Sequence, residues 1–345
     1  MLTFICCLAL GSVFLPCRWR VARGGIALVG YGSMCIFLGL RDHIGADWDN
    51  YRAIFRSFAT PSSLNLYIFV EPLYAICNRL VNIAGGDIHL VNLICATIFL
   101  ACLFNFSRLV AMDSNLLLFI AAPYLLFVVG MGYTRQSVAI GLVLNAIGYL
   151  RHRRERMFYL LAGLAALFHY PAVFVALLWW INSSKRLVSV AVTAAAAVLL
   201  VILLLSGNRY VRLYLYNNAA VQSHGVGFRI LIIALGLLVI LVQKIPWTRE
   251  PQLRRMILKG AVALGILAIL SLFLSTLADR VCLYLFFIYL LGVGSLIRYA
   301  KLPFKYLSIY FVICLTYAMF FVWFGLSSYA AASWFPYGIS LYGSS

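Results

Sequence analysis

Residues 114–130 read SNLLLFIAAPYLLFVVG, and residues 136–150 read QSVAIGLVLNAIGYL; neither run contains a charged side chain. Only five residues, MGYTR, separate the two runs, and Arg135 is the single charge between 114 and 150. Each run is close to the length that an α-helix needs to cross the hydrocarbon core of a bilayer, about 20 residues. Two such runs with so short a connection predict a pair of membrane helices.

The composition of the whole chain is also that of a membrane protein. Of its 345 residues 65% are apolar and 10% are charged, and the mean hydropathy is +1.00. A soluble domain of this size needs far more polar surface, and disordered chains are much less apolar. We therefore predict an all-α fold, a single polytopic domain over 1–345 with about 10 to 12 membrane segments. The clear apolar spans are about 2–16, 24–40, 88–107, 114–130, 136–150, 187–206, 226–243, 257–277, 281–297 and 306–326.

Two further segments are apolar but ambiguous. Residues 64–84 contain Glu71 and Arg79, so we expect an amphipathic or re-entrant piece at the outer side. Residues 157–181 contain the sequence FHYP, and proline disfavours helix at the preceding residue and removes a backbone donor. We expect a broken helix pair there with His169 near the break, in a place where protein or a wet cavity satisfies the backbone.

The charges orient the chain in the membrane. The net charge is +18, and 22 of the 27 basic residues are arginine. In a membrane protein this excess first reflects the positive-inside rule, so we expect no nucleic acid partner. The basic clusters placed in the cytoplasm are Arg18/Arg20/Arg23, 151–156, 244–259 and Arg298/Lys301/Lys305. Both termini are then outside, and the outer regions are about 41–87, 130–135, 207–225 and 327–345.

Motifs for metal or nucleotide chemistry are scarce. The nine cysteines lie mostly within apolar runs and are typical of small buried hydrophobes. The sequence has no HExxH, GxSxG, Walker or GxGxxG motif, which argues against a zinc protease, a serine hydrolase and an ATP-driven pump. Asp47-Trp48-Asp49 has the DxD spacing of many metal-dependent glycosyltransferases, but Arg41 and Arg52 lie close enough in sequence to pair these acids. We expect no metal site.

The arginines at the outer side need another explanation, because the positive-inside rule does not cover them. Arg135 follows two glycines that allow a tight entry into the next span. Arg280 precedes Tyr284 by four residues, so the two share a helix face. One interpretation is snorkelling to lipid headgroups. Together with Arg41 they favour a site for a phosphorylated lipid, since guanidinium groups suit bidentate phosphate recognition.

Several short segments follow one another along the chain. They are RDHIGAD at 41–47 with Tyr51, EPLY at 71–74, YTRQSVA at 133–139, FHYP at 168–171, Arg209-Tyr210 with Tyr214, Arg280 with Tyr284, and WFPY at 334–337. In this order they resemble the EpsG family of Wzy-type O-antigen or exopolysaccharide repeat-unit polymerases. The resemblance runs from residue 41 to the C-terminus, and its most telling pair is the RQ that opens an apolar helix and the later FH.

The resemblance implies a GT-C-like membrane glycosyltransferase of the bacterial inner membrane, with its active site facing the periplasm. Such an enzyme transfers a growing glycan from undecaprenyl pyrophosphate to the non-reducing end of a lipid-linked repeat unit, without metal, nucleotide or other cofactor. The implied partners are the undecaprenyl-pyrophosphate-linked oligosaccharide, the lipid bilayer and a chain-length regulator.

The resemblance and the chemistry of a pyrophosphate leaving group together give the outer arginines a role. Negative charge develops on the leaving group as the sugar–pyrophosphate bond breaks, and arginines fixed in advance stabilise it. Arg135 and Arg280 are the leading candidates, with Arg41 and Arg209 in support.

The acceptor hydroxyl also needs a base or an orienting acceptor. Asp47, Glu71 and His169 all remain open for that role, and Asp47 also suits substrate positioning. The further substrate-binding candidates are Gln136, Tyr210, Tyr284, Trp334 and Tyr337, although the aromatic tail at 329–342 fits an interfacial belt equally well.

Two other classes of function remain to be weighed. A transporter or flippase of the same lipid-linked oligosaccharide also needs a cationic cavity, but one that opens to both sides; the predicted charges gather at the outer side and favour a one-sided active site. An acyltransferase needs a histidine with an acidic partner, and none of the five histidines has a clear one in the sequence. Ligation of a finished polymer onto lipid A core is a close mechanistic relative that the chemistry leaves open.

Overall fold

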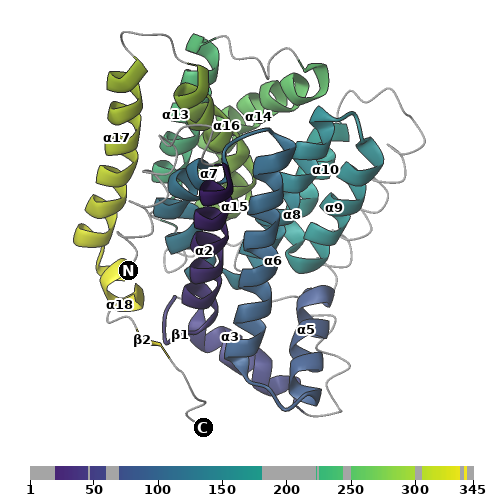
Figure 1. The fold of residues 1–345 in the computed structure, drawn as a ribbon. Helices are drawn as coiled ribbons and strands as arrows, with labels where there is room; N and C mark the ends of the chain where they lie inside the picture. Colours follow the sequence, from purple (N-terminus) through teal and green to yellow (C-terminus); the bar gives the residue numbers. More distant parts are fainter. Residues whose placement is uncertain are drawn as a thin grey trace. The chain divides into compact units, whose positions relative to one another are not determined.

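The computed structural model describes residues 20–45, 47–59, 70–180, 223, 225–243, 250–299, 305–334 and 338–339. Helices make up nearly all of this part of the chain (Figure 1), which confirms the predicted all-α fold. The chain divides into two compact units, unit 1 with Met1–Asn145 and Lys301–Ser345, and unit 2 with Ala146–Ala300. Some predictions lie outside the described residues: the spans 2–16 and 187–206, and the candidates Arg209, Tyr210 and Tyr337.

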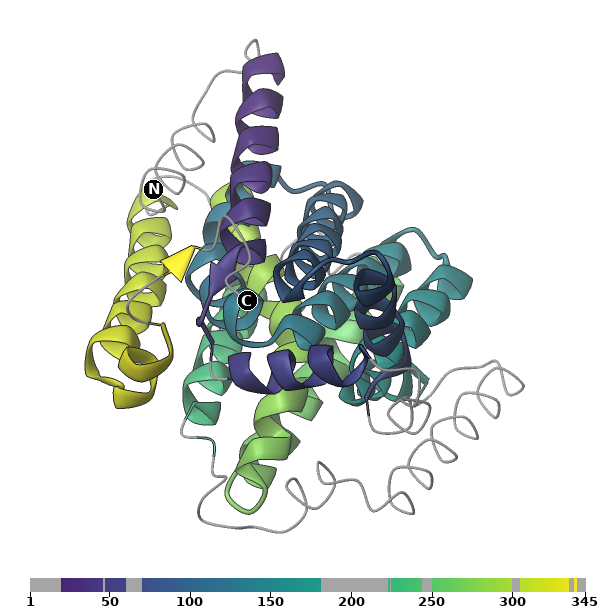
Figure 2. The ribbon, with the colours of Figure 1, turned by 90° about the horizontal axis from the view of Figure 1, so that it is seen from below.

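Unit 1 is built on long helices that pack side by side. Helix α2 packs along α6 and α7, and Figure 2 shows α17 and α18, in yellow, folded against each other. Its elements are α2 (Arg20–Gly39), β1 (Arg41–Asp42), α3 (Trp48–Ser57), α5 (Pro72–Ile83), α6 (Ile88–Leu109), α7 (Ser114–Ala121), the π-helical segment η3 (Ala122–Gly130), α8 (Thr134–Arg151, which continues past the unit boundary), α17 (Lys305–Leu326), α18 (Ser328–Trp334) and β2 (Gly338–Ile339).

The uncharged run at 114–130 forms the core of unit 1, where every residue from 115 to 130 is buried. Pro123 interrupts the helix because it has no backbone N–H for the carbonyl of Phe119, four residues earlier. The π-helical segment η3 begins beside this proline, and the Tyr317 hydroxyl of α17 donates to the Phe119 carbonyl at 2.8 Å. The backbone group released by the proline is therefore satisfied by protein, as an apolar environment requires.

Unit 2 contains the remaining helices. Glycines bring two of them into close contact: a Cβ on Gly236 of α13 would collide with the Tyr289 backbone, and one on Gly292 of α16 would collide with the Gly236 backbone. The elements of unit 2 are α9 (Glu155–Phe168), the 3-10 turn η4 (Tyr170–Ala172), α10 (Val173–Trp180), α13 (Val226–Gln243), α14 (Pro251–Leu270), α15 (Ser275–Cys282), the 3-10 turn η7 (Leu283–Leu285) and α16 (Phe286–Tyr299).

The predicted break in 157–181 is confirmed. Helix α9 ends at Phe168, His169 is extended with φ −157°, and η4 carries Pro171 before α10 begins. A second boundary differs from the prediction of one span at 257–277 and the next at 281–297. Helix α14 ends at Leu270 and α15 begins at Ser275, so Asp279 and Arg280 lie within a helix. The turn at 271–274 escaped prediction because its sequence, SLFL, is mostly apolar.

The described helices include several that suit a bilayer. Those long and apolar enough to cross it are Ile88–Leu109, Val226–Gln243, Ser275–Leu296 and Ile309–Leu326. Shorter apolar helices occupy Gly24–Gly39, Ser114–Gly130 and Tyr170–Trp180. The protein is thus an all-α polytopic membrane protein.

Helix α5 is too short to cross the bilayer. Its 12 residues extend over about 18 Å, against a hydrocarbon core of about 30 Å. Ile76, Leu80 and Ile83 are exposed along one side, while Tyr74 and Asn78 are buried on the other. Residues 72–83 therefore confirm an amphipathic helix within 64–84, and its placement at the outer side stays a prediction.

Candidate active site

Arg135 and Glu71 form a buried ion pair in unit 1. Arg135 Nη1 donates to Glu71 Oε2 at 2.5 Å, and the two residues are only 8% and 6% exposed. Glu71 directly precedes α5, whose start Pro72 fixes, and Arg135 lies in the first turn of α8. The structure thus brings together two residues that the sequence predicted separately, one as a leaving-group cation and one as a candidate base.

Two tyrosines flank the Arg135 guanidinium. Its carbon lies 5.5 Å from the centre of the Tyr51 ring and 5.7 Å from that of Tyr74, and the two rings meet edge to face at 5.8 Å. A guanidinium over aromatic faces gains cation–π attraction, more so away from water. The acid and the two rings together fix the position of the cation.

The Tyr74 hydroxyl is a buried polar group in this site. The residue is fully buried, and its Oη has no hydrogen-bond partner among the described residues. Burial raises the pKa of Tyr74 well above its ordinary value, so the phenol stays protonated. A buried hydroxyl without a partner is costly, because its desolvation is not compensated.

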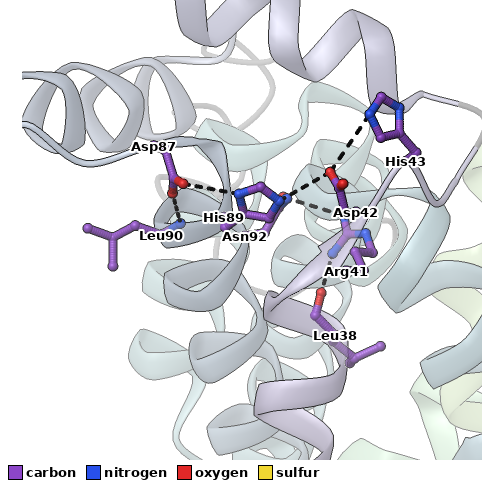
Figure 3. Close-up of polar contacts among 8 residues, drawn as sticks. All are labelled: Leu38, Arg41, Asp42, His43, Asp87, His89, Leu90 and Asn92. Carbon is purple, nitrogen blue, oxygen red and sulfur yellow. Dashed lines mark hydrogen bonds and ion pairs between the residues drawn. The ribbon is translucent and has the colours of Figure 1, made fainter. Parts of the chain in front are cut away.

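Arg41 belongs to the same unit as Arg135 and Glu71 and is 1% exposed. Its guanidinium donates to the Leu38 carbonyl at 2.5 Å, to Thr134 Oγ1 at 2.5 Å and to Asn92 Oδ1 at 3.4 Å (Figure 3 shows the Leu38 and Asn92 contacts). Since Thr134 directly precedes Arg135, Arg41 connects β1 and α6 to the start of α8. The role predicted for Arg41, binding pyrophosphate alongside Arg135 and Arg280, stays a prediction, since its guanidinium is buried and donates to three protein acceptors.

The C-terminal helix α18 supports the turn from which Arg135 arises. Trp334 is 3% exposed, and its Nε1 donates to the Phe127 carbonyl at 2.9 Å. A Cβ on Gly132 would lie 2.9 Å from the Trp334 ring, so only glycine permits this packing. Trp334, predicted as a substrate contact, is therefore packed against the turn that precedes Arg135.

The same turn is held from a second direction by the loop after β1. Gly45 has φ +99°, and a Cβ there would lie 2.6 Å from the Met131 carbonyl. Its N–H donates to the Ser333 carbonyl at 2.8 Å. Glycine is thus needed both for the left-handed backbone and for the close approach.

The other predicted residues of unit 1 occupy less central positions. Gln136 is buried, one residue after Arg135. Asp47 is the N-cap residue of α3, without a side-chain capping bond, and is half-buried. Helix α3 places Tyr51 on the site, with its ring 5.5 Å from the Arg135 guanidinium carbon.

Unit 2 contains its own polar group of residues. His169 Nδ1 and the Tyr284 hydroxyl lie 2.7 Å apart, and both residues are buried. Arg280 is half-buried in α15, one turn before Tyr284. His169, Tyr284 and Arg280, predicted from two separate segments of the sequence, thus all belong to the part of unit 2 where η4 meets α15.

Sequence reasoning missed several residues. Arg229, the only charge of α13, forms a buried ion pair with Asp279. The signal that could have identified it is a lone charge in an apolar span. Tyr51 and Tyr74 were part of the resemblance but not of the predicted site. His89 has two acidic partners, Asp42 and Asp87, which corrects the expectation that no histidine has one.

The comparisons with known proteins bear on what this arrangement does. The family model described as the EpsG family matches residues 26–339, which is most of the chain. No curated protein and no solved structure matches the chain. Proteins of the EpsG family are Wzy-like polymerases, which points to polysaccharide polymerisation from lipid-linked oligosaccharide in a bilayer. This polytopic membrane protein belongs to the EpsG family.

Proposed function

We propose that this protein polymerises undecaprenyl-pyrophosphate-linked oligosaccharide repeats at the periplasmic face of the bacterial inner membrane. The growing glycan leaves undecaprenyl pyrophosphate and joins the non-reducing end of a second lipid-linked repeat unit. The observation that carries the proposal is the buried Arg135, fixed by Glu71 and two tyrosines in a chain of this family.

The proposed chemistry is a substitution at the anomeric carbon of the donor sugar. The acceptor hydroxyl oxygen forms the new bond to that carbon, the bond from the carbon to the pyrophosphate oxygen breaks, and its electron pair stays on the pyrophosphate. Arg135 stabilises that developing charge. Because folding has already ordered its side chain between Tyr51 and Tyr74, little reorganisation is needed during the reaction.

Glu71 has a double role in this proposal. In the structure its carboxylate holds Arg135 through Nη1. A phosphate oxygen that takes over this Nη1 group leaves the Glu71 carboxylate to accept the proton of the acceptor hydroxyl. Substrate binding would then produce the base at the moment it is needed, and Tyr74 Oη would supply a hydrogen bond to the same substrate.

The exposed apolar side of α5 supports a lipid-linked substrate. Ile76, Leu80 and Ile83 are exposed on the helix that begins directly after Glu71. In the proposed arrangement this 12-residue amphipathic helix would lie in the membrane interface. Glu71 and Arg135 would then lie near the level at which the pyrophosphate headgroup of a membrane lipid is found.

In unit 2, Arg280 remains a proposed second cation for the lipid-linked substrate. It stands one turn before Tyr284, whose hydroxyl bonds His169. Its role is tested separately from that of Arg135, by the Arg280→Ala variant.

The test of the proposed function is reconstitution. Purified protein in proteoliposomes is given lipid-linked repeat units without nucleotide or added metal, and the products are separated by size. A ladder of polymers is expected. Repeat units that cross the bilayer without becoming joined would instead identify a flippase.

A further inference from the structure

His89 bridges two carboxylates at the start of α6 (Figure 3). Its Nδ1 lies 3.1 Å from Asp87 Oδ2, and its Nε2 lies 3.3 Å from Asp42 Oδ1. Asp87 is the N-cap residue of α6, and Asp42 belongs to β1. The imidazole therefore ties the first turn of α6 to a strand that is distant in sequence.

The bridge needs the doubly protonated ring. A carboxylate only accepts hydrogen bonds, whereas a neutral imidazole has one N–H donor and one bare nitrogen. Both contacts are hydrogen bonds only when the ring is an imidazolium. Partial burial acts to raise the pKa of Asp87, but hydrogen bonds from His89 and from the Leu90 N–H outweigh it and hold that pKa below its ordinary value. Asp87 is thus an anion facing the ring.

The other groups around the ring are few in the described part of the chain. From the loop after β1, His43 Nε2 lies 4.0 Å from the same Asp42 oxygen, and its side chain is mostly exposed. From α3, the buried Trp48 ring lies 5.6 Å from the His89 ring. Since both nitrogens of His89 face carboxylates, neither is open to act as the base of an acyl transfer.

The bridge also acts on Arg41. Asn92 lies one turn after His89 on α6 and accepts a hydrogen bond from Arg41, while His89 contacts Asp42, the next residue of β1. One turn of α6 thus holds both residues of this strand. β1 has only two residues and its pairing with β2 is equally short, so these side-chain contacts add to its attachment. Thr134, which also binds Arg41, carries the connection to Arg135.

We propose that protonated His89 is a positioning residue that fixes Asp42 and Arg41 for the polymerase reaction, and that the reaction slows when this proton is lost. The inference rests on the proposed polymerase function. Without its second proton the ring presents a lone pair to one of the two carboxylates. That contact changes from attraction to repulsion, β1 loosens from α6, and Arg41 is no longer held in one position.

The decisive variant is Asp87→Asn. The asparagine amide can donate to the bare nitrogen of a neutral ring, whose remaining N–H still donates to Asp42, so the bridge no longer needs the second proton. Asparagine is also as good an N-cap as aspartate, so α6 is preserved. His89→Gln, which cannot span both partners, is the matched loss-of-bridge variant.

The first readout is the pH dependence of polymer formation. For the wild-type protein we expect a fall on the alkaline side that approaches tenfold per pH unit. Asp87→Asn should retain the acid-side rate and lose this fall, and His89→Gln should be slow at every pH. If Asp87→Asn shows the same alkaline fall in rate as the wild-type protein, the proposal is overturned.

The second readout does not depend on polymerase activity. Exchange of the imidazole C2 hydrogen with deuterium, followed by mass spectrometry of peptides, reports the protonation of each histidine separately. We expect Asp87→Asn to move the exchange curve of His89 to lower pH and to leave that of the exposed His152 unchanged. An unchanged His89 curve would refute the bridge, whereas a moved curve in a protein that makes no polymer at any pH would refute only the polymerase function.

Discussion

Arg135 and Glu71, 64 residues apart in sequence, form a buried ion pair that joins the start of α8 to the start of α5. Replacing one member of such a pair by a neutral residue leaves an uncompensated buried charge, which lowers the free energy of unfolding by about 3–5 kcal/mol. We therefore expect Arg135→Ala to lower the unfolding temperature measurably. The double variant Glu71→Leu with Arg135→Met should recover most of the lost stability and remain inactive. An active double variant would show that the pair serves folding alone.

Arg135→Lys separates charge from geometry. Lysine keeps the positive charge but not the planar fork that binds phosphate through two donors. Loss of a single preorganised donor to a developing anion costs about 100-fold in rate. We expect a loss of that order in the rate of polymer formation, with little change in unfolding temperature. A wild-type rate in this variant would show that the reaction needs only the positive charge at this position and not the planar guanidinium.

Tyr74→Phe tests the buried hydroxyl. Its oxygen has no partner among the described residues, and an unsatisfied buried polar group costs about 1–3 kcal/mol, so removal should leave stability unchanged or raise it. If the hydroxyl binds substrate, the rate should fall about tenfold, since hydrogen bonds to charged groups contribute about 1.5–3 kcal/mol. Unfolding temperature and polymer rate, measured on the same preparation, check the two expectations. A slow variant that is also less stable would contradict them.

The Tyr317 hydroxyl should compensate for the carbonyl that Pro123 leaves unsatisfied. Tyr317→Phe removes the hydrogen bond to Phe119 and should destabilise the protein by about 1 kcal/mol. In a Pro123→Ala background the restored backbone N–H can take that role, so the same substitution should cost less. A double-mutant cycle on the unfolding free energy measures this coupling. Equal costs in both backgrounds would refute the link.

The contact between α13 and α16 depends on two glycines. Gly236→Ala or Gly292→Ala would place a methyl group against backbone, which cannot move aside as a side chain can, and overpacking costs about 1–3 kcal/mol or more. Gly265→Ala in α14 is the matched control, because its added methyl meets nothing within 4 Å, and alanine favours helix by about 1 kcal/mol. The unfolding temperature should fall in the first two variants and hold or rise in the third.

The sequence predicted the helices of this protein better than the contacts between them. Apolar runs located the helices, and Pro171 located the break at His169, because both signals are local. The end of α14 was missed because its turn contains no glycine, proline or charge.

The candidate site was predicted only in part, because local signals identify single residues but not their partners. Arg135 and Glu71 were each recognisable as ionisable residues at membrane boundaries, yet nothing local indicated that they pair. The bridge at His89 was invisible, because one of its two partners lies 47 residues away. Long-range pairing is decided by packing, which residue patterns do not encode.

The most direct test of the central claim is the release of undecaprenyl pyrophosphate by protein in proteoliposomes, measured as lipid-linked repeats are consumed. We predict one undecaprenyl pyrophosphate for each glycosidic bond formed by the wild-type protein and by Arg56→Ala, whose arginine is exposed on α3. Arg135→Ala should release none above background while remaining folded in the membrane. Release at the wild-type rate from Arg135→Ala would contradict the account.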